Sequence, residues 1–502
     1  MEQEFELIAK TFMGLEPVLA QELTELGANN VQTGRRMVSF TGNKEMMYRA
    51  NFQLHTAIRI LKPIAHFKAD TADKVYDEIK KIDWTQYLDL KKSFSVDSVV
   101  FSEEFRHSKF VSYKVKDAIV DQFREKFGKR PNISVANPDI RLNMHIAEDQ
   151  CTLSLDSSGE SLHRRGYRQE SVEAPLNEVL AAGMILMTGW RGETDFVDPM
   201  CGSGTLPIEA ALIAHNMAPG LFRKEYAFEK WPDFDRDLFD QIYNDDSNER
   251  EFTHHIYGYD IDLAAVTKAR LNVKAAGMTK CITIEQADIK NFKQPAEKAI
   301  MVTNPPYGER ISTPDLLGTY RTIGEILKHQ FKENDAWVLS YREECFDQIG
   351  LKPSIKIPLY NGSLECEFRK YQIFDGKLKD FRSEGNILKT EEEKRAMADS
   401  TASRKTASSR SALKRKMTTR KATSARSNST RFRSKTAATA DASAENAAVS
   451  AETLTTIRIL ATTSARAATS TTTATGADAK AEKATKTTKA NAITVKRFDY
   501  ET

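Results

Sequence analysis

Between residues 175 and 341 the sequence alternates short apolar runs with helix-like stretches. The apolar runs are DFVDPM (195–200), HIYGYD (255–260), CITIEQAD (281–288), AIMVTNPPY (299–307) and AWVLSY (336–341). Helices are expected over 175–189, where Pro175 suits the first helical position, and over 205–217, 262–276 and 315–330. This alternation predicts an α/β fold built on a doubly wound, mostly parallel sheet.

The fourth apolar run ends in Asn304-Pro305-Pro306-Tyr307. A side-chain amide, two fixed φ angles and an aromatic ring at the end of a strand suit a planar group that bears an NH2. The Asn304 side-chain oxygen and the Pro305 carbonyl can each accept one amine hydrogen, and Tyr307 can stack on the ring. Two such acceptors would turn the nitrogen lone pair toward an electrophile. Taken alone, the tetrad is equally well interpreted as a Pro-rich turn that closes the strand.

The first strand runs into a glycine loop that extends from Asp198 to Thr205. Gly202 and Gly204 allow close approach of the backbone to a ligand, and nucleotides bind at this edge of doubly wound sheets. The loop matches neither GxGxxG nor GxxxxGK[ST], and no lysine follows the second glycine to meet a triphosphate. Asp198 would repel a pyrophosphate but attract a cationic amino-acid head group. The loop therefore indicates S-adenosylmethionine rather than NAD or ATP.

Carboxylates end the next two strands of the predicted sheet. Asp260 is placed to bind ribose hydroxyls, although an aromatic-rich segment (219–250) lengthens the usual spacing of about 20 residues from the loop. Asp262 is better interpreted as the N-cap of the following helix. Asp288 is either an acceptor for the adenine amine or another turn carboxylate. Cys201 has no evident histidine partner, so packing within the loop is favoured over a nucleophilic role.

Composition restricts the remaining classes. A chain of 502 residues allows two to four domains. No run of 18 or more apolar residues occurs, and the N-terminus is acidic and without a signal-peptide core, so we expect no membrane span and a cytoplasmic location. The five cysteines are far apart and form no CxxC pair, which argues against a disulfide framework or a zinc site: Cys151, Cys201, Cys281, Cys345 and Cys366.

Charge is distributed unevenly along the chain. Residues 391–502 hold 22 Lys and Arg against 11 Asp and Glu, whereas residues 1–390 hold 51 basic and 59 acidic residues. Residues 401–440 contain 12 basic residues and no acidic one. The Ser/Thr/Ala-rich composition of this tail predicts disorder. A mobile polycation is typical of salt-sensitive contact with nucleic acid, and a solubilising tail of no specific role is the alternative.

The first 160 residues predict a smaller α+β region. Residues 1–60 indicate strand, helix and strand, helices are expected over 70–82 and 111–127, and strands over 94–100, 140–146 and 151–156. His107, Lys109, Lys114 and Lys116 could form a basic face, although an ordinary solvated helix face is the favoured interpretation.

With these residues in view, residues 1–375 resemble the THUMP-domain class I RNA methyltransferases, and within them the bacterial L-type enzymes that methylate guanine N2 of 23S ribosomal RNA. The stretches that carry the resemblance are HRRGYR (163–168), APLNEVLAAGMI (174–185), FVDPMCGSGTLPIEAALIAHNMAPGL (196–221), YGYDID (257–262), TNPPYGER (303–310), YRTIGEILK (320–328) and LYNGSLECEF (359–368). The N-terminal match is looser and depends on NPDIRLNMHI (137–146). The basic tail lies outside the resemblance.

The resemblance implies four segments: a ferredoxin-like region (1–60), a THUMP RNA-binding domain (61–160), a Rossmann-like class I methyltransferase domain (161–385) and a disordered basic tail (386–502). It implies S-adenosylmethionine as cofactor and no metal. The implied cofactor-binding residues are Asp198, Pro199, Cys201, Gly202, Gly204, Thr205, Asp260, Asp288 and Asn304. The implied catalytic residues are Asn304, Pro305, Pro306 and Tyr307.

The activity that the resemblance implies is methylation of a guanine N2 amine, in 23S rRNA or a large-subunit precursor, by a monomeric enzyme. The same tetrad occurs in enzymes that methylate adenine N6 or the side-chain amide of glutamine, so it indicates an NH2 group and leaves its owner open. Transfer-RNA guanine, protein glutamine and a non-catalytic RNA-binding role therefore remain alternatives. The arginines of HRRGYR are expected either to contact phosphate or to form structural salt bridges.

Overall fold

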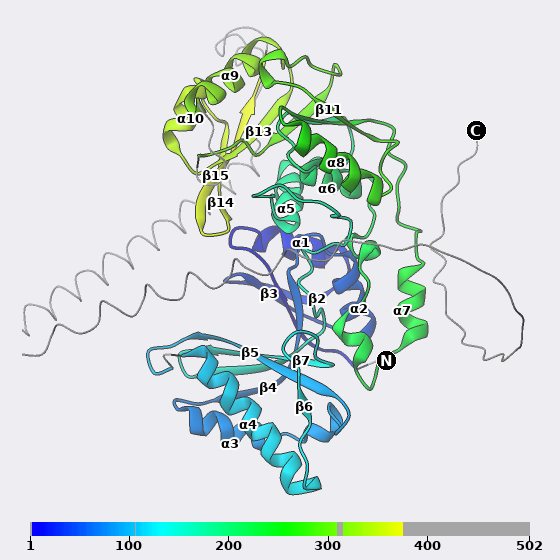
Figure 1. Ribbon diagram of the computed structural model, residues 1–502, viewed down its shortest axis with the longest axis vertical. Coiled ribbons are helices and arrows are strands. Elements are labelled where there is room, and N and C mark those ends of the chain that lie inside the picture. Colours follow the sequence, from blue (N-terminus) through cyan, green and yellow to red (C-terminus); the bar gives the residue numbers. More distant parts are fainter. Residues whose placement is uncertain (1–2, 106, 309–314, 375–502) are drawn as a thin grey trace, which may run out of the picture. The chain divides into compact units, whose positions relative to one another are not determined.

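The computed structural model describes residues 3–105, 107–308 and 315–374 (Figure 1). These residues all belong to one compact unit, Met1–Arg415. The basic tail that the sequence predicts over residues 386–502 lies outside the described residues. Within the described part, no helix combines the length and the apolar character that crossing a bilayer requires.

An eight-stranded mixed sheet is built by the N-terminal half, in the order β2-β3-β1-β4-β8-β7-β5-β6. Its strands are β1 (Phe5–Lys10), β2 (Asn29–Gly34), β3 (Met37–Gly42), β4 (Arg59–Lys68), β5 (Ser93–Phe101), β6 (Asn132–Ile133), β7 (Ile140–Ala147) and β8 (Gln150–Asp156). Its helices are α1 (Glu16–Glu25), α2 (Lys44–Gln53), α3 (Ala72–Lys81), η1 (Trp84–Gln86) and α4 (Ser108–Phe127). Helices α3 and α4 lie together on one face of β4, β5 and β7 (Figure 1).

Strand β4 joins the two parts of this sheet, because it pairs with β1 on one side and with β8 on the other. No strand was predicted over these residues, and a proline inside a run is unusual in a central strand. The structure accommodates Pro63 at a register shift between Pro63 and Ala65, where the ladder with β8 is interrupted.

The core of the N-terminal half follows the period of its strands. In β7 the residues Ile140, Leu142, Met144 and Ile146 are buried, and the residues between them are partly exposed. Val75 and Ile79 of α3 and Val115 and Ile119 of α4 belong to the same buried cluster. The two predicted helices thus bury apolar residues that recur at helical spacing.

The second sheet has seven strands in the order β11-β10-β9-β12-β13-β15-β14. They are β9 (Asp195–Asp198), β10 (Ile256–Asp260), β11 (Ile282–Gln286), β12 (Ala299–Thr303), β13 (Asp335–Ser340), β14 (Ile355–Asn361) and β15 (Leu364–Gln372). Strands β9 to β13 are parallel, and the β14–β15 hairpin is added antiparallel at β13. The predicted doubly wound, mostly parallel sheet is confirmed.

Helices cover both faces of this sheet, and its strands are apolar on both faces as a result. In β12, Val302 packs in the cluster that contains α5 (Glu178–Thr188), α6 (Thr205–His215) and α8 (Leu263–Ala275), while Met301 packs in the cluster that contains α9 (Leu316–His329) and α10 (Glu343–Ile349). Strand β12, which the sequence predicted as an apolar run, is therefore buried on both faces of the sheet. The tetrad begins directly after it, at Asn304.

The aromatic-rich segment 219–250 packs against the N-terminal half. It forms two short 3₁₀ helices, η2 (Pro219–Phe222) and η3 (Ala227–Lys230), and the α-helix α7 (Arg236–Tyr243). Phe228 stacks on Tyr48 of α2 at a ring-centroid distance of 4.4 Å, and Tyr226 stacks on Phe228 at 5.1 Å. This segment explains why the glycine loop and Asp260 are so far apart in the sequence.

The predicted starts of two helices are wrong by three residues: α4 begins at Ser108, not at residue 111, and α5 also differs. Helix α5 begins at Glu178, not at Pro175, because the Asn177 side chain accepts hydrogen bonds from the backbone N–H groups of Val179 and Leu180 and so caps the helix. Pro175 lies before this cap and lines the cavity described below.

Candidate active site

The glycine loop turns the chain from β9 into α6. Gly202 and Gly204 have φ angles of 54° and 84°, which a side chain disfavours. A Cβ on Gly204 would lie 3.2 Å from the Cβ of Ala269, so this glycine also allows α8 to approach the loop closely. The loop is fastened to the neighbouring strand, since the Cys201 N–H donates to the carbonyl of Tyr259 at 2.8 Å.

Asp198 ends β9 and is 1 % exposed. Its Oδ1 accepts hydrogen bonds from the Met200 N–H at 3.1 Å and from the Thr303 hydroxyl at 2.9 Å. Burial raises the pKa of Asp198 to about 7, a rise that these two hydrogen bonds only partly oppose. In the free protein this carboxyl therefore titrates near neutral pH, and a cation beside it would favour its ionised form.

Asp260 ends β10 and fixes the loop from the other side. Its Oδ2 accepts from the Gly202 N–H and its Oδ1 from the Asp262 N–H, both at 2.9 Å. Burial raises the pKa of Asp260 from its ordinary value, against these backbone hydrogen bonds. Each oxygen keeps a further lone pair, so the carboxylate can still accept from a bound hydroxyl.

The other two carboxylates have local roles in this structure. Asp262 caps α8, with its side chain accepting from the Ala264 N–H at 2.9 Å, as the sequence predicted. Asp288 is half-buried, lines the cavity and accepts from the Lys290 N–H at 2.9 Å. Asp288 is thus a turn carboxylate, which was one of its two predicted roles. Its other oxygen could still accept a hydrogen bond from an adenine amine, which was the alternative.

The tetrad continues from the end of β12. Asn304 is half-buried, and its Oδ1 accepts a hydrogen bond from the hydroxyl of Tyr307. That hydroxyl in turn accepts from the Asn361 Nδ2 at 3.2 Å. The Tyr307 ring is 9 % exposed and meets Tyr341 edge to face at 5.7 Å. The Tyr307 hydroxyl thus takes one of the two lone pairs of the Asn304 oxygen, and a ligand donor at this atom would share the oxygen with it or displace it.

A cavity of about 820 Å³ brings the predicted residues together. Its walls include Asp198, Pro199, Cys201, Gly202, Thr205, Asp260, Asp288, Asn304, Pro305, Pro306 and Tyr307. Gly204 is the exception among the predicted residues: it does not line the cavity and instead packs against Ala269. The glycine loop and the tetrad thus face one common space.

Besides residues 172–176, two further segments line the same cavity and were given no role from the sequence. They are Thr319, Arg321 and Thr322 of α9, and Asn361 and Leu364 of the β14–β15 hairpin. The signal was present, since these residues fall in or beside the stretches 320–328 and 359–368 that carry the family resemblance. They come from a helix and from the turn of an antiparallel hairpin, so the pattern of polar residues at the ends of parallel strands did not mark them.

Burial and neighbouring carboxylates raise the pKa of the Cys201 thiol well above its ordinary value. The thiol is therefore uncharged and unsuited to nucleophilic attack, which agrees with a packing role. Among the described residues, no group of three or more His, Cys, Asp or Glu side chains is placed to hold a metal ion.

The structural interpretation of HRRGYR is confirmed for two of its arginines. Arg165 is 2 % exposed and pairs with Glu209 of α6 at 3.3 Å, while its Nη2 donates to the carbonyl of His55. Arg168 pairs with Glu178 at 2.8 Å. Arg164 alone of the three is exposed, and it pairs with Glu160.

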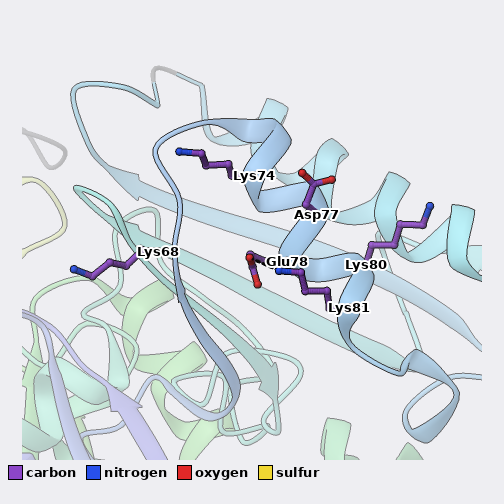
Figure 2. Close-up of a pocket in the computed structure, with 6 residues that line it drawn as sticks. All are labelled: Lys68, Lys74, Asp77, Glu78, Lys80 and Lys81. Atoms are coloured by element: carbon purple, nitrogen blue, oxygen red, sulfur yellow. Dashed lines mark hydrogen bonds and ion pairs between the residues drawn. The ribbon is translucent and has the colours of Figure 1, made fainter.

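Two of the four residues that could have formed a basic face on and beside α4 are ion-paired, which agrees with the favoured interpretation of a solvated helix face. Lys114 pairs with Asp73 at 2.6 Å and Lys116 with Asp117 at 2.7 Å. A shallow hollow of about 520 Å³ lies nearby, between α3 and the end of β4, and is lined by Lys68, Lys74, Asp77, Glu78, Lys80 and Lys81 (Figure 2). Mixed charges at an open surface provide no catalytic arrangement, and the favoured interpretation of a solvated, ion-paired surface fits these helices.

A doubly wound sheet, a glycine loop between carboxylates and an Asn-Pro-Pro-Tyr tetrad on one cavity define a Rossmann-like class I methyltransferase. Comparison with known families gives matches to three models: an RlmL ferredoxin-like domain over residues 6–61, a THUMP domain over 69–156 and an RMKL-like methyltransferase domain over 165–370.

Known proteins agree with this arrangement. The Synechocystis protein slr0064, a candidate RNA methyltransferase, is 38% identical over 364 residues, which are 72% of this chain and 95% of that protein. A ribosomal RNA large subunit methyltransferase K/L of Syntrophotalea carbinolica is 40% identical over 387 residues, which are 74% of this chain and 54% of that protein. The chain thus spans about half the length of its K/L relatives.

Solved structures match over the same region. The methyltransferase candidate SMU.472, in complex with SAH, has a TM-score of 0.68 and 31% identity, over 75% of this chain and 100% of that one. A possible methylase from Clostridium difficile 630 also has a TM-score of 0.68, with 32% identity over the same shares of the two chains. The chain belongs to the RMKL-like methyltransferase family with ferredoxin-like and THUMP domains, and it is an enzyme that transfers methyl groups.

Proposed function

We propose that this enzyme transfers the methyl group of S-adenosylmethionine to the exocyclic N2 amine of a guanine in 23S ribosomal RNA. The observation that carries the proposal is the common cavity, which has the glycine loop, Asp260 and Asp288 on its walls together with the Asn304–Tyr307 tetrad. A methyl donor and a planar amine can therefore meet in one space. The names of the K/L relatives support ribosomal RNA as the substrate, and guanine N2 is inferred from the family resemblance.

The residues fit S-adenosylmethionine as the donor. Carboxylates at Asp198 and Asp260 suit its cationic and hydroxyl groups, and the glycines admit a close backbone approach. SAH, the product form of this donor, is bound in the related SMU.472 structure. When bound, the donor supplies a methyl group on a sulfonium whose thioether leaves without acid catalysis.

The chain's own contribution is to position and stabilise the amine. The Asn304 Oδ1 and the Pro305 carbonyl accept the two amine hydrogens, which aligns the nitrogen lone pair and stabilises the positive charge that develops on nitrogen. The Tyr307 hydroxyl gives up or shares its hydrogen bond to Asn304 as the base enters. A paired guanine must first leave its stack, and the Tyr307 ring takes over the stacking once it turns toward the base. The proton that the amine loses passes to water.

We further propose that the four segments of the chain have the separate roles that the resemblance implies. Residues 1–60 form the ferredoxin-like region, residues 61–160 bind RNA by shape and phosphate contact, residues 161–385 form the catalytic domain, and residues 386–502 form a basic tail. The enzyme acts as a monomer in the cytoplasm and uses no metal. The presence of a THUMP domain in the same chain favours RNA over protein glutamine as the substrate.

Radiolabelled methyl transfer tests the proposed function directly. The enzyme is incubated with labelled S-adenosylmethionine and with unmodified 23S rRNA, transfer RNA or a protein fraction in parallel. We expect label in 23S rRNA alone. Label in transfer RNA would show that the substrate is transfer RNA and not 23S rRNA. Label in protein would show that the enzyme modifies protein and not RNA. Absence of label from all three would favour a non-catalytic RNA-binding role.

The basic tail is expected to make salt-sensitive contacts with RNA. Deleting residues 391–502 removes 22 basic side chains. The slope of the logarithm of RNA affinity against the logarithm of salt concentration should become flatter, because fewer counterions are released. Turnover on short substrates should not change. An unchanged slope in filter binding across a salt series would show that the tail does not contact RNA.

A further inference from the structure

Arg168 lies behind the glycine loop and holds two of its hydroxyl groups. Its Nη1 donates to the Ser203 Oγ and its Nη2 to the Thr205 Oγ1, both at 2.9 Å. The guanidinium is itself held by Glu178 at 2.8 Å and by the carbonyl of Leu176 at 3.4 Å. Among the described residues, Arg168 is not one of those that line the cavity, whereas Ser203 and Thr205 are.

The same loop has a second anchor to the segment that follows Arg168. The Asn272 Oδ1 accepts from the N–H groups of Gln169 and Glu170, and its Nδ2 donates to the Ser203 carbonyl at 2.9 Å. Because Asn272 is fully buried on α8, these bonds fix the segment and the loop to one helix. Arg168 therefore reaches the two hydroxyls from a rigid support.

Both hydroxyls are set up to donate hydrogen bonds into the cavity. Ser203 and Thr205 are 2 % and 3 % exposed, and each uses its oxygen to accept from Arg168. Within the described residues neither hydroxyl donates a hydrogen bond to a protein acceptor, so each has its hydrogen available. A hydroxyl that accepts from a guanidinium is polarised and becomes a better donor to an anion.

We propose that Arg168 is a positioning residue for the carboxylate of the methionine part of the donor. It acts through Ser203 and Thr205, whose O–H groups bind that carboxylate at the start of α6. Gly204 is the N-cap of this helix and offers no side-chain cap of its own. The Ser203 and Thr205 hydroxyls, polarised by the Arg168 guanidinium, thus supply the side-chain hydrogen-bond donors at the start of α6 that Gly204 lacks. This inference rests on the proposed placement of the donor in the loop.

Two ligands that differ only at the amino-acid end test the inference without RNA or turnover. S-adenosylhomocysteine has the amino-acid ammonium and carboxylate, and 5′-methylthioadenosine has the same nucleoside without either group. For Arg168→Gln we expect affinity for S-adenosylhomocysteine to fall about 10- to 100-fold in calorimetry, as for loss of charge-assisted hydrogen bonds. Affinity for 5′-methylthioadenosine should stay within about twofold of wild type.

Conservative and neighbouring variants separate positioning from folding. Arg168→Lys keeps the charge and one donor, so it should recover part of the S-adenosylhomocysteine affinity. Ser203→Ala with Thr205→Val should reproduce the Arg168→Gln result. Arg164→Gln, an exposed arginine of the same segment, is the matched control and should bind both ligands as wild type does.

Equal weakening of both ligands in Arg168→Gln, at an unchanged melting temperature, would overturn the inference, since it would mean a general role in shaping the cavity. Wild-type affinity for both ligands would overturn it as well. If wild type binds the two ligands equally, the carboxylate is not bound at all and the inference is wrong. None of these outcomes depends on methylation, so failure of the proposed function on RNA would be seen separately.

Discussion

Replacing Asn304 with alanine should reduce kcat for methylation by about 10²- to 10³-fold, the usual effect of losing a group that stabilises charge in a transition state. Although the resemblance also places Asn304 among the cofactor-binding residues, binding of S-adenosylmethionine should remain within about twofold of wild type, because Asp198, Asp260 and the glycine loop are untouched. The fall in kcat is expected because the Asn304 Oδ1 acts as a hydrogen-bond acceptor, and it already accepts from the Tyr307 hydroxyl in this structure. Single-turnover kinetics on substrate RNA, with calorimetry for the donor, measure the two quantities.

Tyr307→Phe is the matched variant for this prediction. It removes the hydroxyl that occupies Asn304 and keeps the ring for stacking. Single-turnover rates should therefore stay within about tenfold of wild type, far above those of Asn304→Ala. If Asn304→Ala instead loses affinity for the donor at an unchanged melting temperature, the tetrad contributes to the donor site and its assignment to the amine is wrong.

Asp198→Asn should make the ligand-free protein more stable at pH 8 while it weakens binding of the donor. The pKa of Asp198 is raised by burial to about 7, above its ordinary value of 3.8. For an acid whose folded-state pKa is raised, ionisation costs stability, and this cost grows as pH rises from about 4 to 7. A rise of about three units corresponds to about 4 kcal/mol in the free energy of unfolding above pH 7.

Urea unfolding of both proteins at pH 5 and pH 8 measures this effect. The stability gained by Asp198→Asn should be clearly larger at pH 8, because at pH 5 the folded wild type still holds the proton. The asparagine keeps an oxygen to accept from Met200 and Thr303, so the hydrogen bonds of the loop survive. An equal gain at both pH values would contradict a raised pKa of Asp198.

The catalytic sheet was predictable because each of its strands has a local signature. Apolar runs ending in Asp198, Asp260, Asp288 and Asn304 placed all four residues at one edge of a parallel sheet, and the structure puts all four on one cavity. Parallel strands present their carboxyl ends together, so position along the chain is enough to bring such residues near one another.

The elements that were missed depend on distant partners. Strand β4 contains Pro63, and the ladder with β8 shifts its register beside this proline. For Arg168 the sequence left phosphate contact and a structural salt bridge open, since nothing in HRRGYR reveals that Glu178, Ser203 and Thr205 surround it. Asn361 reaches Tyr307 from a hairpin 54 residues further along the chain. Such contacts arise from the tertiary fold, and local patterns do not encode them.

The identity of the methylated group tests the central claim most directly. Unmodified 23S rRNA is treated with wild-type enzyme or Asn304→Ala in the presence of S-adenosylmethionine, digested to nucleosides and analysed by mass spectrometry. We expect N2-methylguanosine with the wild type and only a trace with the variant. Methylated adenosine, or a methylated guanosine that forms equally with both proteins, would contradict the assignment of the tetrad to a guanine N2 amine.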